Sequence, residues 1–315
     1  MVRVPIRRGI GRAEAGAARR APAHPGREPG GGEVYERCSA AGRLGRVRRT
    51  AADRGAGCRW SPMTSVLARG CGDSWVMVRR CLRRTVRSRD TLLISILLPV
   101  LIMLLFVYVF GGAIQVDVPY VAYVVPGIIL LCTGFGASIT ATAVAWDVRG
   151  GAVERFRTLP SFRQALLAGH VGEGMLRNLG VIVLVVAVAI ALGFRPRAGF
   201  LAWAAVAGLV LLFVHAIAWI SIALGLLARN PEAAGGFTYA IMFIPYVSSA
   251  FVPTATMPGW LRGFADHQPA TPIVGTIRGL LTATPTGSGA LSAVLWCLGL
   301  SAVGFLCAAL LFERR

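Results

Sequence analysis

Residues 237–281 read FTYAIMFIPYVSSAFVPTATMPGWLRGFADHQPATPIVGTIRGLL, and this stretch decides how the rest of the chain is interpreted. It begins as an apolar helix and breaks at Pro245, after which further prolines prevent any long helix. The connection that follows is too apolar for an ordinary water-facing loop. Broken backbone near a bilayer is tolerated only where protein or a cavity receives it. We therefore expect a pair of short re-entrant helices packed on the outer face of a helix bundle; a partly ordered outer loop is the alternative.

The side chains of this outer segment that we assign to a gate or release site are mostly apolar. Trp260 and Phe264 stand four residues apart and share one face of a short helix, so we expect them to be buried against the bundle. The full candidate set is Phe251, Pro253, Met257, Pro258, Trp260 and Phe264.

The composition around this segment is that of a membrane protein. Hydrophobic residues make up 55% of the chain and charged residues only 15%. About 20 apolar residues in a helix cross the hydrocarbon core of a bilayer, which is about 30 Å thick. The sequence predicts an all-α membrane protein with six transmembrane helices, at residues 91–110, 120–145, 175–193, 200–228, 233–252 and 291–312. The fifth is the weakest, because Pro245 interrupts it.

A basic amphipathic segment precedes the first span, within residues 63–90. Val78, Leu82 and Val86 continue a stripe that starts at Trp75, and arginines cover the other side. Such a helix lies in the membrane interface with its arginines near lipid phosphates; a soluble helix with a solvated charged face is the alternative. The interfacial set is Trp75, Arg79, Arg80, Arg83, Arg84 and Arg87.

Residues 1–62 differ from the rest of the chain. They hold 14 Arg and 5 acidic residues, with no apolar run that could form a core. One interpretation is a disordered basic arm that touches anionic lipid or nucleic acid. The interpretation that we favour is a mis-assigned start, with the protein beginning at Met63. We therefore expect no nucleic-acid partner.

The distribution of arginine sets the orientation in the membrane. The segments on one side of the six predicted spans hold 14 Arg, whereas the alternate loops hold 4. Because positive charge accumulates on the cytoplasmic side, both termini of the 91–315 domain are predicted to be cytoplasmic.

All 33 basic residues are Arg, so the chain lacks the lysine that a P-loop needs to reach nucleotide phosphates. If ATP powers this protein, another chain must bind and hydrolyse it. The Cys and His residues show no metal-ligand spacing, and we find no catalytic set. His215 lies within a span, where it is either a functional polar site or a neutral side chain that hydrogen-bonds a neighbouring helix. The second interpretation is favoured.

The predicted loop from 146 to 177 is longer than a plain connection needs. Its middle mixes apolar and charged residues, a composition that suits docking into a groove on a partner. A solvated connection whose arginines only set the topology is the alternative.

Four stretches in order resemble the ABC-2 type transport permeases. They are YVFGGAI at 108–114, GGAVERFRTLPSFRQALL at 150–167, WISIALGLLARNPEAAGGF at 219–237 and SSAFVPTATMPGWLRGFADHQPATPIVGTIRGL at 248–280. The resemblance covers Met63 to Arg315 and is to the daunorubicin-resistance permease group of actinomycete drug exporters.

This resemblance implies a non-enzymatic permease subunit in the plasma membrane, working as a homodimer or heterodimer. A separate ATPase would carry ATP and Mg and would couple through Glu154, Arg155, Phe156, Arg157, Leu159 and Pro160. The expected cargo is a hydrophobic small molecule such as an antibiotic. Export of a lipid-linked polysaccharide is the nearest alternative, and a channel or an intramembrane enzyme is a more distant one.

Overall fold

The computed structural model describes residues 63–114, 118–151, 165–285 and 287–314. Within them every regular element is helical. The long elements are α1 (Met63–Arg87), α2 (Arg89–Leu105), α3 (Tyr120–Arg149), α5 (Ala165–Ala191), α6 (Phe200–Leu227) and α10 (Gly289–Arg314). The shorter ones are η2 (Phe106–Phe110), α7 (Pro231–Phe243), η3 (Ile244–Val247), η4 (Thr254–Thr256), α8 (Gly259–His267) and α9 (Ala270–Thr282).

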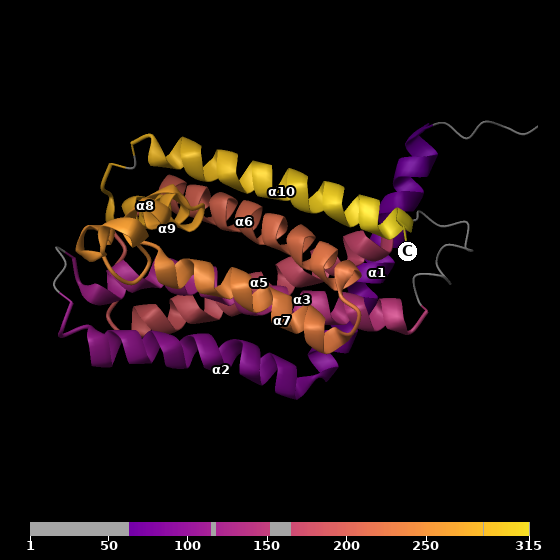
Figure 1. The fold of residues 1–315 in the computed structure, drawn as a ribbon, viewed down its shortest axis with the longest axis horizontal. Coiled ribbons are helices and arrows are strands. Elements are labelled where there is room, and N and C mark those ends of the chain that lie inside the picture. Colours follow the sequence, from indigo (N-terminus) through magenta and orange to yellow (C-terminus); the bar gives the residue numbers. More distant parts are fainter. Residues whose placement is uncertain (1–62, 115–117, 152–164, 286, 315) are drawn as a thin grey trace, which may run out of the picture. The chain divides into compact units, whose positions relative to one another are not determined.

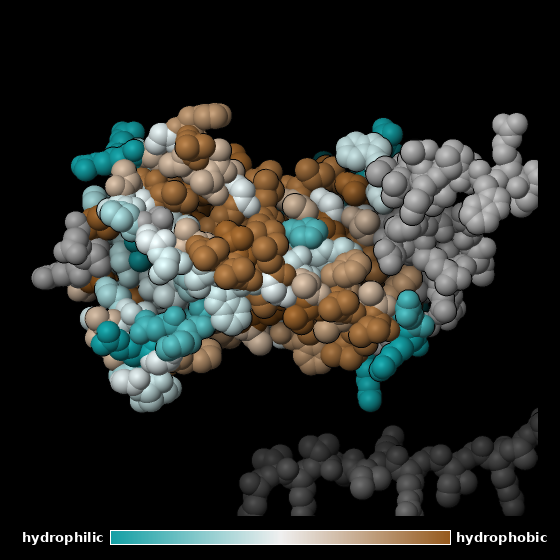
Figure 2. Space-filling view, turned by 90° about the horizontal axis from the view of Figure 1, so that it is seen from above, coloured by the Kyte–Doolittle hydropathy of each residue, from teal (hydrophilic) through white to brown (hydrophobic). Residues whose placement is uncertain are grey.

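The long helices run side by side, with α1 at one end of them and α8 and α9 at the other (Figure 1). Five helical stretches of the described residues are long and apolar enough to cross a membrane, at Arg89–Phe110, Tyr120–Arg149, Leu166–Ala191, Phe200–Leu227 and Gly289–Arg314. Figure 2 shows apolar side chains over the middle of the visible face and hydrophilic ones towards its two ends, as a bilayer requires.

The core is organised around α3. In its most apolar stretch 72% of the residues are buried, against 17% in the corresponding stretches of α2 and α10. Small residues allow the close packing: a Cβ on Gly136 would lie 1.9 Å from Asn178 Oδ1 of α5, and one on Gly225 of α6 would lie 2.6 Å from the carbonyl oxygen of Ala141. The peripheral helices α2 and α10 instead expose leucines, which suits contact with lipid.

The predicted fifth span is shorter than the other spans. Asn230 caps α7, because its Oδ1 accepts a hydrogen bond from the amide of Ala233 at 2.7 Å. The helix then tightens into a 3₁₀ turn that contains Pro245, after which the chain leaves helical geometry at Ser248. The 13 residues of α7 and the 4 of η3 together rise about 28 Å.

The prediction for the third span is wrong at its start. The helix begins at Ala165, ten residues before the predicted 175. The extra turns carry ionisable residues, and these are buried because they pair with one another and with neighbouring helices, as described below.

The outer segment forms two short helices, α8 and α9. Helix α9 enters the core through Ile273, Val274 and Ile277, each 0% exposed. The expectation that Trp260 and Phe264 are buried is wrong for the single chain, since they are 79% and 58% exposed. Ala265 of α8 is buried, while Trp260 and Phe264 are turned away from it, by about 140° and about 100° around the helix axis.

Candidate functional site

A buried polar junction joins α1, α3 and α5. Asp147 lies near the end of α3, where Arg84 Nη1 of α1 is 3.0 Å from its Oδ1. His170 Nε2 of α5 lies 3.1 Å from the other carboxylate oxygen. The side chain of His170 is 3% exposed and that of Asp147 is 10% exposed. Both oxygens of one carboxylate are thus held by different helices.

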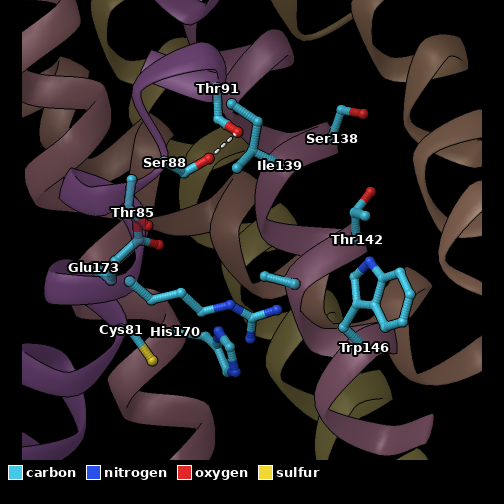
Figure 3. Close-up of a pocket in the computed structure, with 12 residues that line it drawn as sticks. Cys81, Thr85, Ser88, Thr91, Ser138, Ile139, Thr142, Trp146, His170 and Glu173 are labelled. Carbon is cyan, nitrogen blue, oxygen red and sulfur yellow. Dashed lines mark hydrogen bonds between the residues drawn. The ribbon is translucent and has the colours of Figure 1, made fainter. Parts of the chain in front are cut away.

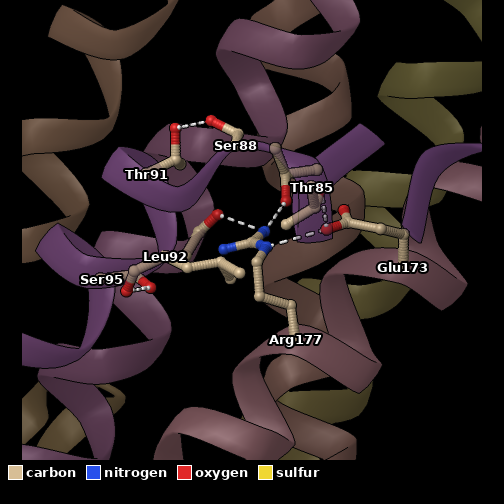
Figure 4. A network of polar contacts seen from close by, with 9 residues as sticks. Thr85, Ser88, Thr91, Leu92, Ser95, Glu173 and Arg177 are labelled. Carbon is tan, nitrogen blue, oxygen red and sulfur yellow. Dashed lines mark hydrogen bonds and ion pairs between the residues drawn. The ribbon is translucent and has the colours of Figure 1, made fainter. Parts of the chain in front are cut away.

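One helical turn further along α5, Glu173 and Arg177 form a second pair (Figure 4). Arg177 Nε donates to Glu173 Oε1 at 2.9 Å, and their side chains are 2% and 4% exposed. Arg177 Nη2 also donates to the carbonyl oxygen of Gly136 at 3.1 Å and to Thr140 Oγ1 at 2.8 Å, both on α3. Thr85 of α1 donates to Glu173 Oε1 at 2.8 Å.

This arrangement holds three helices in a fixed register. Removing one member of a buried ion pair typically costs about 3–5 kcal/mol, because the other charge is left uncompensated. These contacts lie near the two ends of the connection between α3 and α5. Asp147 is close to the end of α3, and His170 is close to the start of α5. Helix α1 therefore touches both ends of the connection between α3 and α5.

Sequence reasoning missed this junction, because it assigned Glu173 and Arg177 to the 146–177 loop. The signal was present: an acid and an arginine four residues apart share one face of a helix, and the segment between them contains no helix-breaking proline. Composition alone treats such residues as water-exposed.

A polar pocket of about 330 Å³ opens beside the junction (Figure 3). Hydroxyl groups from α1, α2 and α3 and the turn between α1 and α2 form part of its wall, beside apolar surface, and Trp146 also lines it. The lining residues labelled in the figure are Cys81, Thr85, Ser88, Thr91, Ser138, Ile139, Thr142, Trp146, His170 and Glu173, and Arg84 and Ala143 complete the lining.

An apolar groove of about 460 Å³ continues from this pocket along the bundle. The two share Thr91, Ser138 and Ile139 in their walls, so they adjoin one another, and together they are called the hollow below. The groove lies between α2, α3 and α7 and is lined by Ile94, Leu98, Ile102, Phe135, Met242 and Tyr246, among others.

The segment predicted to be an amphipathic helix is helical and forms α1, but the face it turns to the bundle differs from the expected stripe. Val78 and Cys81 are buried, whereas Trp75 and Val86 are 65% and 59% exposed. Because Val78 packs near Gly172 of α5, the contact face continues through Cys81 to Thr85. The arginines of the candidate set are exposed: Arg79, Arg80, Arg83, Arg84 and Arg87.

The remaining candidates are distributed along the molecule. The six coupling residues at positions 154–157, 159 and 160 lie outside the described residues. His215 accepts a hydrogen bond from Trp219 Nε1, on the same helix, at 3.1 Å. In the outer segment Phe251 is 2% exposed and its ring stacks on that of Phe106, with centroids 4.3 Å apart.

Arg278 of α9 holds the outer segment together. Its guanidinium lies 3.6 Å from the centroid of the Tyr123 ring of α3. Its Nη2 donates to the carbonyl oxygens of Ser249 at 2.7 Å and of Tyr123 at 3.1 Å. Sequence reasoning counted Arg278 only as a charge in an outer loop; the structure makes it the link between α3, α9 and the turn after η3.

Comparison with known proteins identifies the family. Residues 73–282 match the ABC-2 type transporter family, so two thirds of the chain is covered, and the chain belongs to that family. It is 31% identical over 191 residues to a daunorubicin resistance ABC transporter permease protein of Streptomyces coeruleorubidus, covering 60% of this chain and 68% of that protein. It is 28% identical over 241 residues to a probable doxorubicin resistance ABC transporter permease protein of Mycobacterium tuberculosis, covering 72% of this chain and 83% of that protein.

Proposed function

We propose that this chain is the permease subunit of an exporter that moves a hydrophobic small molecule, such as an antibiotic, out of the cell. Membership of the ABC-2 family supports the permease role. The relatives named for daunorubicin and doxorubicin resistance support a drug as cargo.

In this proposal the chain crosses the plasma membrane six times, with both termini in the cytoplasm. The five long apolar stretches form five of the spans. The sixth is formed by α7 and η3, whose combined rise of about 28 Å is close to the thickness of the hydrocarbon core. The excess of arginine on one side orients the bundle. The polar junction then lies at the cytoplasmic end, with α1 along the inner membrane surface.

The driving energy comes from a separate ATPase, which carries ATP and Mg. The chain lacks the lysine of a P-loop, so it has no such site of its own. Two permease chains, identical or different, would pair with two such subunits. The ATPase docks on the connection between α3 and α5, at Glu154, Arg155, Phe156, Arg157, Leu159 and Pro160.

The observation that carries this proposal is the junction between α1, α3 and α5. Asp147 and Glu173 lie on the two helices that frame the docking connection, and α1 bonds to both through Arg84 and Thr85. A push on the connection therefore moves three helices as one unit rather than bending a loop. Such a rigid path is what transmission from an ATPase to a bundle requires.

The test is efflux of doxorubicin from cells that express the chain together with the ATPase of its operon. We expect the double variant Phe156→Ala with Arg157→Ala to insert normally, to lose co-purifying ATPase and to lose efflux, because an aromatic and an arginine together usually dominate an interface. The matched control is Arg195→Ala with Arg197→Ala, which removes exposed arginines from the predicted outer side. Normal efflux and ATPase capture by the first variant would contradict the docking site. Absence of efflux in the wild type with its ATPase would contradict the cargo.

A further inference from the structure

The pocket and the groove together have the shape and polarity of a site for a single amphiphile. One end offers hydroxyl groups and a guanidinium, and the other offers aliphatic and aromatic side chains between α2, α3 and α7. The shared lining residues Thr91, Ser138 and Ile139 stand where a polar head would join an apolar tail. A free ion would fill only the first part, and a hydrocarbon only the second.

The charges around the polar end favour an anionic head. Seven arginines lie on α1 and at the first position of α2, at positions 69, 79, 80, 83, 84, 87 and 89, against two acids there, Asp73 and Asp90. Asp147 pairs with Arg84 and Glu173 pairs with Arg177, so these carboxylates offset those two arginines and leave the other arginines of α1 and α2 in excess over the acids. A cation would have to displace one of those arginines, whereas an anion would not.

The donors needed to hold such a head are present. Arg84 uses Nη1 for Asp147, its side chain is 57% exposed, and its Nε and Nη2 meet no acceptor in the described part of the chain. His170 also lines the pocket and is 2% exposed; because its Nε2 donates to Asp147, its Nδ1, which has no partner among the described residues, is an acceptor for a hydroxyl of the bound molecule. A buried polar atom without a partner is costly and indicates a missing ligand or water.

We propose that the hollow binds one anionic phospholipid. Its phosphate lies against Arg84 and the hydroxyls of Ser88, Thr91 and Ser138, and one acyl chain lies in the groove. The inner leaflet is its source if the cytoplasmic orientation under "Proposed function" holds, but binding itself does not depend on the cargo or on the ATPase. The bound lipid fills the space between α2 and α7 beside the junction.

Native mass spectrometry of the full chain in mild detergent tests this directly, with phosphatidylglycerol as the titrant. We expect one lipid to bind saturably. Ser138→Leu, which blocks the point where pocket and groove meet without changing charge, should weaken binding at least about tenfold, or about 1.4 kcal/mol. Arg84→Gln should weaken it to a similar extent. Diacylglycerol lacks the phosphate. Its affinity for the wild-type chain should therefore be no higher than the weakened affinity of the Ser138→Leu variant for phosphatidylglycerol.

Matched controls separate the site from general attraction to lipid. Arg83→Gln removes an exposed arginine of the same helix that does not line the pocket, and Ser301→Leu adds the same bulk on α10. Both should keep wild-type binding within about twofold, or about 0.4 kcal/mol. Equal losses in Arg83→Gln and Arg84→Gln, unchanged binding in Ser138→Leu, or absence of a saturable step would each overturn the proposal. Displacement of the lipid by inorganic phosphate at equal concentration would instead assign the pocket to the free ion and also overturn it.

Discussion

The hydroxyl of Thr85 and the carboxylate of Glu173 meet at 2.8 Å although 88 positions separate them in the sequence. The same carboxylate oxygen accepts from Arg177 Nε at 2.9 Å. One atom therefore joins α1 to the buried arginine that in turn holds α3. Hydrogen bonds to a charged acceptor in a low-dielectric environment are stronger than those between neutral groups, so the three helices are coupled through Glu173.

Glu173→Ala should destabilise the protein strongly. It leaves Arg177 buried and uncompensated, and we expect a loss of about 3–5 kcal/mol. Replacing both partners, as in Glu173→Leu with Arg177→Met, should recover much of that loss, because no unpaired charge remains. Unfolding of the detergent-solubilised chain, followed by helical signal against denaturant, measures the difference.

The exposed pair Arg262 and Asp266 serves as the matched control for this prediction. It has the same four-residue spacing, a longer distance of 3.6 Å, and side chains that are 55% and 41% exposed. Asp266→Asn should cost less than about 1 kcal/mol. If Glu173→Ala is as mild as Asp266→Asn, the junction is not structurally important.

The sequence predicts most of the fold because each membrane-spanning helix corresponds to an uninterrupted run of apolar residues. The run at 91–110 and the break at Pro245 both correspond to features of the structure. The start of α5 could not be read in this way, because Glu173 and Arg177 become acceptable in a helix core only when α1 and α3 supply their partners. Local composition does not contain that information.

The site shows the same limit on a smaller scale. Periodicity placed Trp75 and Val86 on the apolar stripe of α1, yet the face in contact with α5 passes through Cys81 and Thr85. In a membrane protein, apolar side chains can face lipid, and hydroxyls can face a polar junction. Hydrophobicity therefore identifies a helix more reliably than it identifies the face turned to the protein.

Arg278→Met should loosen the outer segment without unfolding the bundle. The carbonyl oxygens of Ser249 and Tyr123 would each lose the guanidinium as a donor, although Ser249 keeps the Tyr123 hydroxyl, so the turn after η3 should exchange amide hydrogens faster. Arg278→Lys should not restore the wild-type rate, because a single ammonium cannot both stack on the Tyr123 ring and bridge two carbonyls as the guanidinium does. Hydrogen exchange of residues 248–258 measures this. Arg262→Met is the control, and equal exchange in the two methionine variants would show that the clamp has no effect.

Cys81 should react slowly with maleimide at neutral pH. Burial, together with the nearby carboxylates of Asp147 and Glu173, raises the pKa of its thiol to about 11. Because the thiolate is the reactive form, the labelling rate should increase about tenfold each time the pH is raised by one unit, as long as the pH stays below that pKa. The measurement uses a variant in which Cys81 is the sole cysteine, compared with one whose sole cysteine replaces the exposed Arg83. Similar rates at neutral pH for the two would show that α1 does not pack on α5 as described.

Thr85→Val should separate transmission from docking. The change keeps the shape of the side chain but removes the donor to Glu173, so α1 loses its hydrogen bond to that carboxylate of α5 while residues 152–164 are untouched. We expect the ATPase to co-purify in wild-type amounts and doxorubicin efflux to fall at least about fivefold, the effect of a coupling energy of about 1 kcal/mol. Thr276→Val is the control, because the hydroxyl of Thr276 is also largely buried but bonds only within α9, to the carbonyl oxygen of Pro272 at 2.8 Å. Export that survives Thr85→Val at the level of the control would mean that α1 takes no part in transmission. Loss of the ATPase together with export would mean that α1 belongs to the docking surface itself.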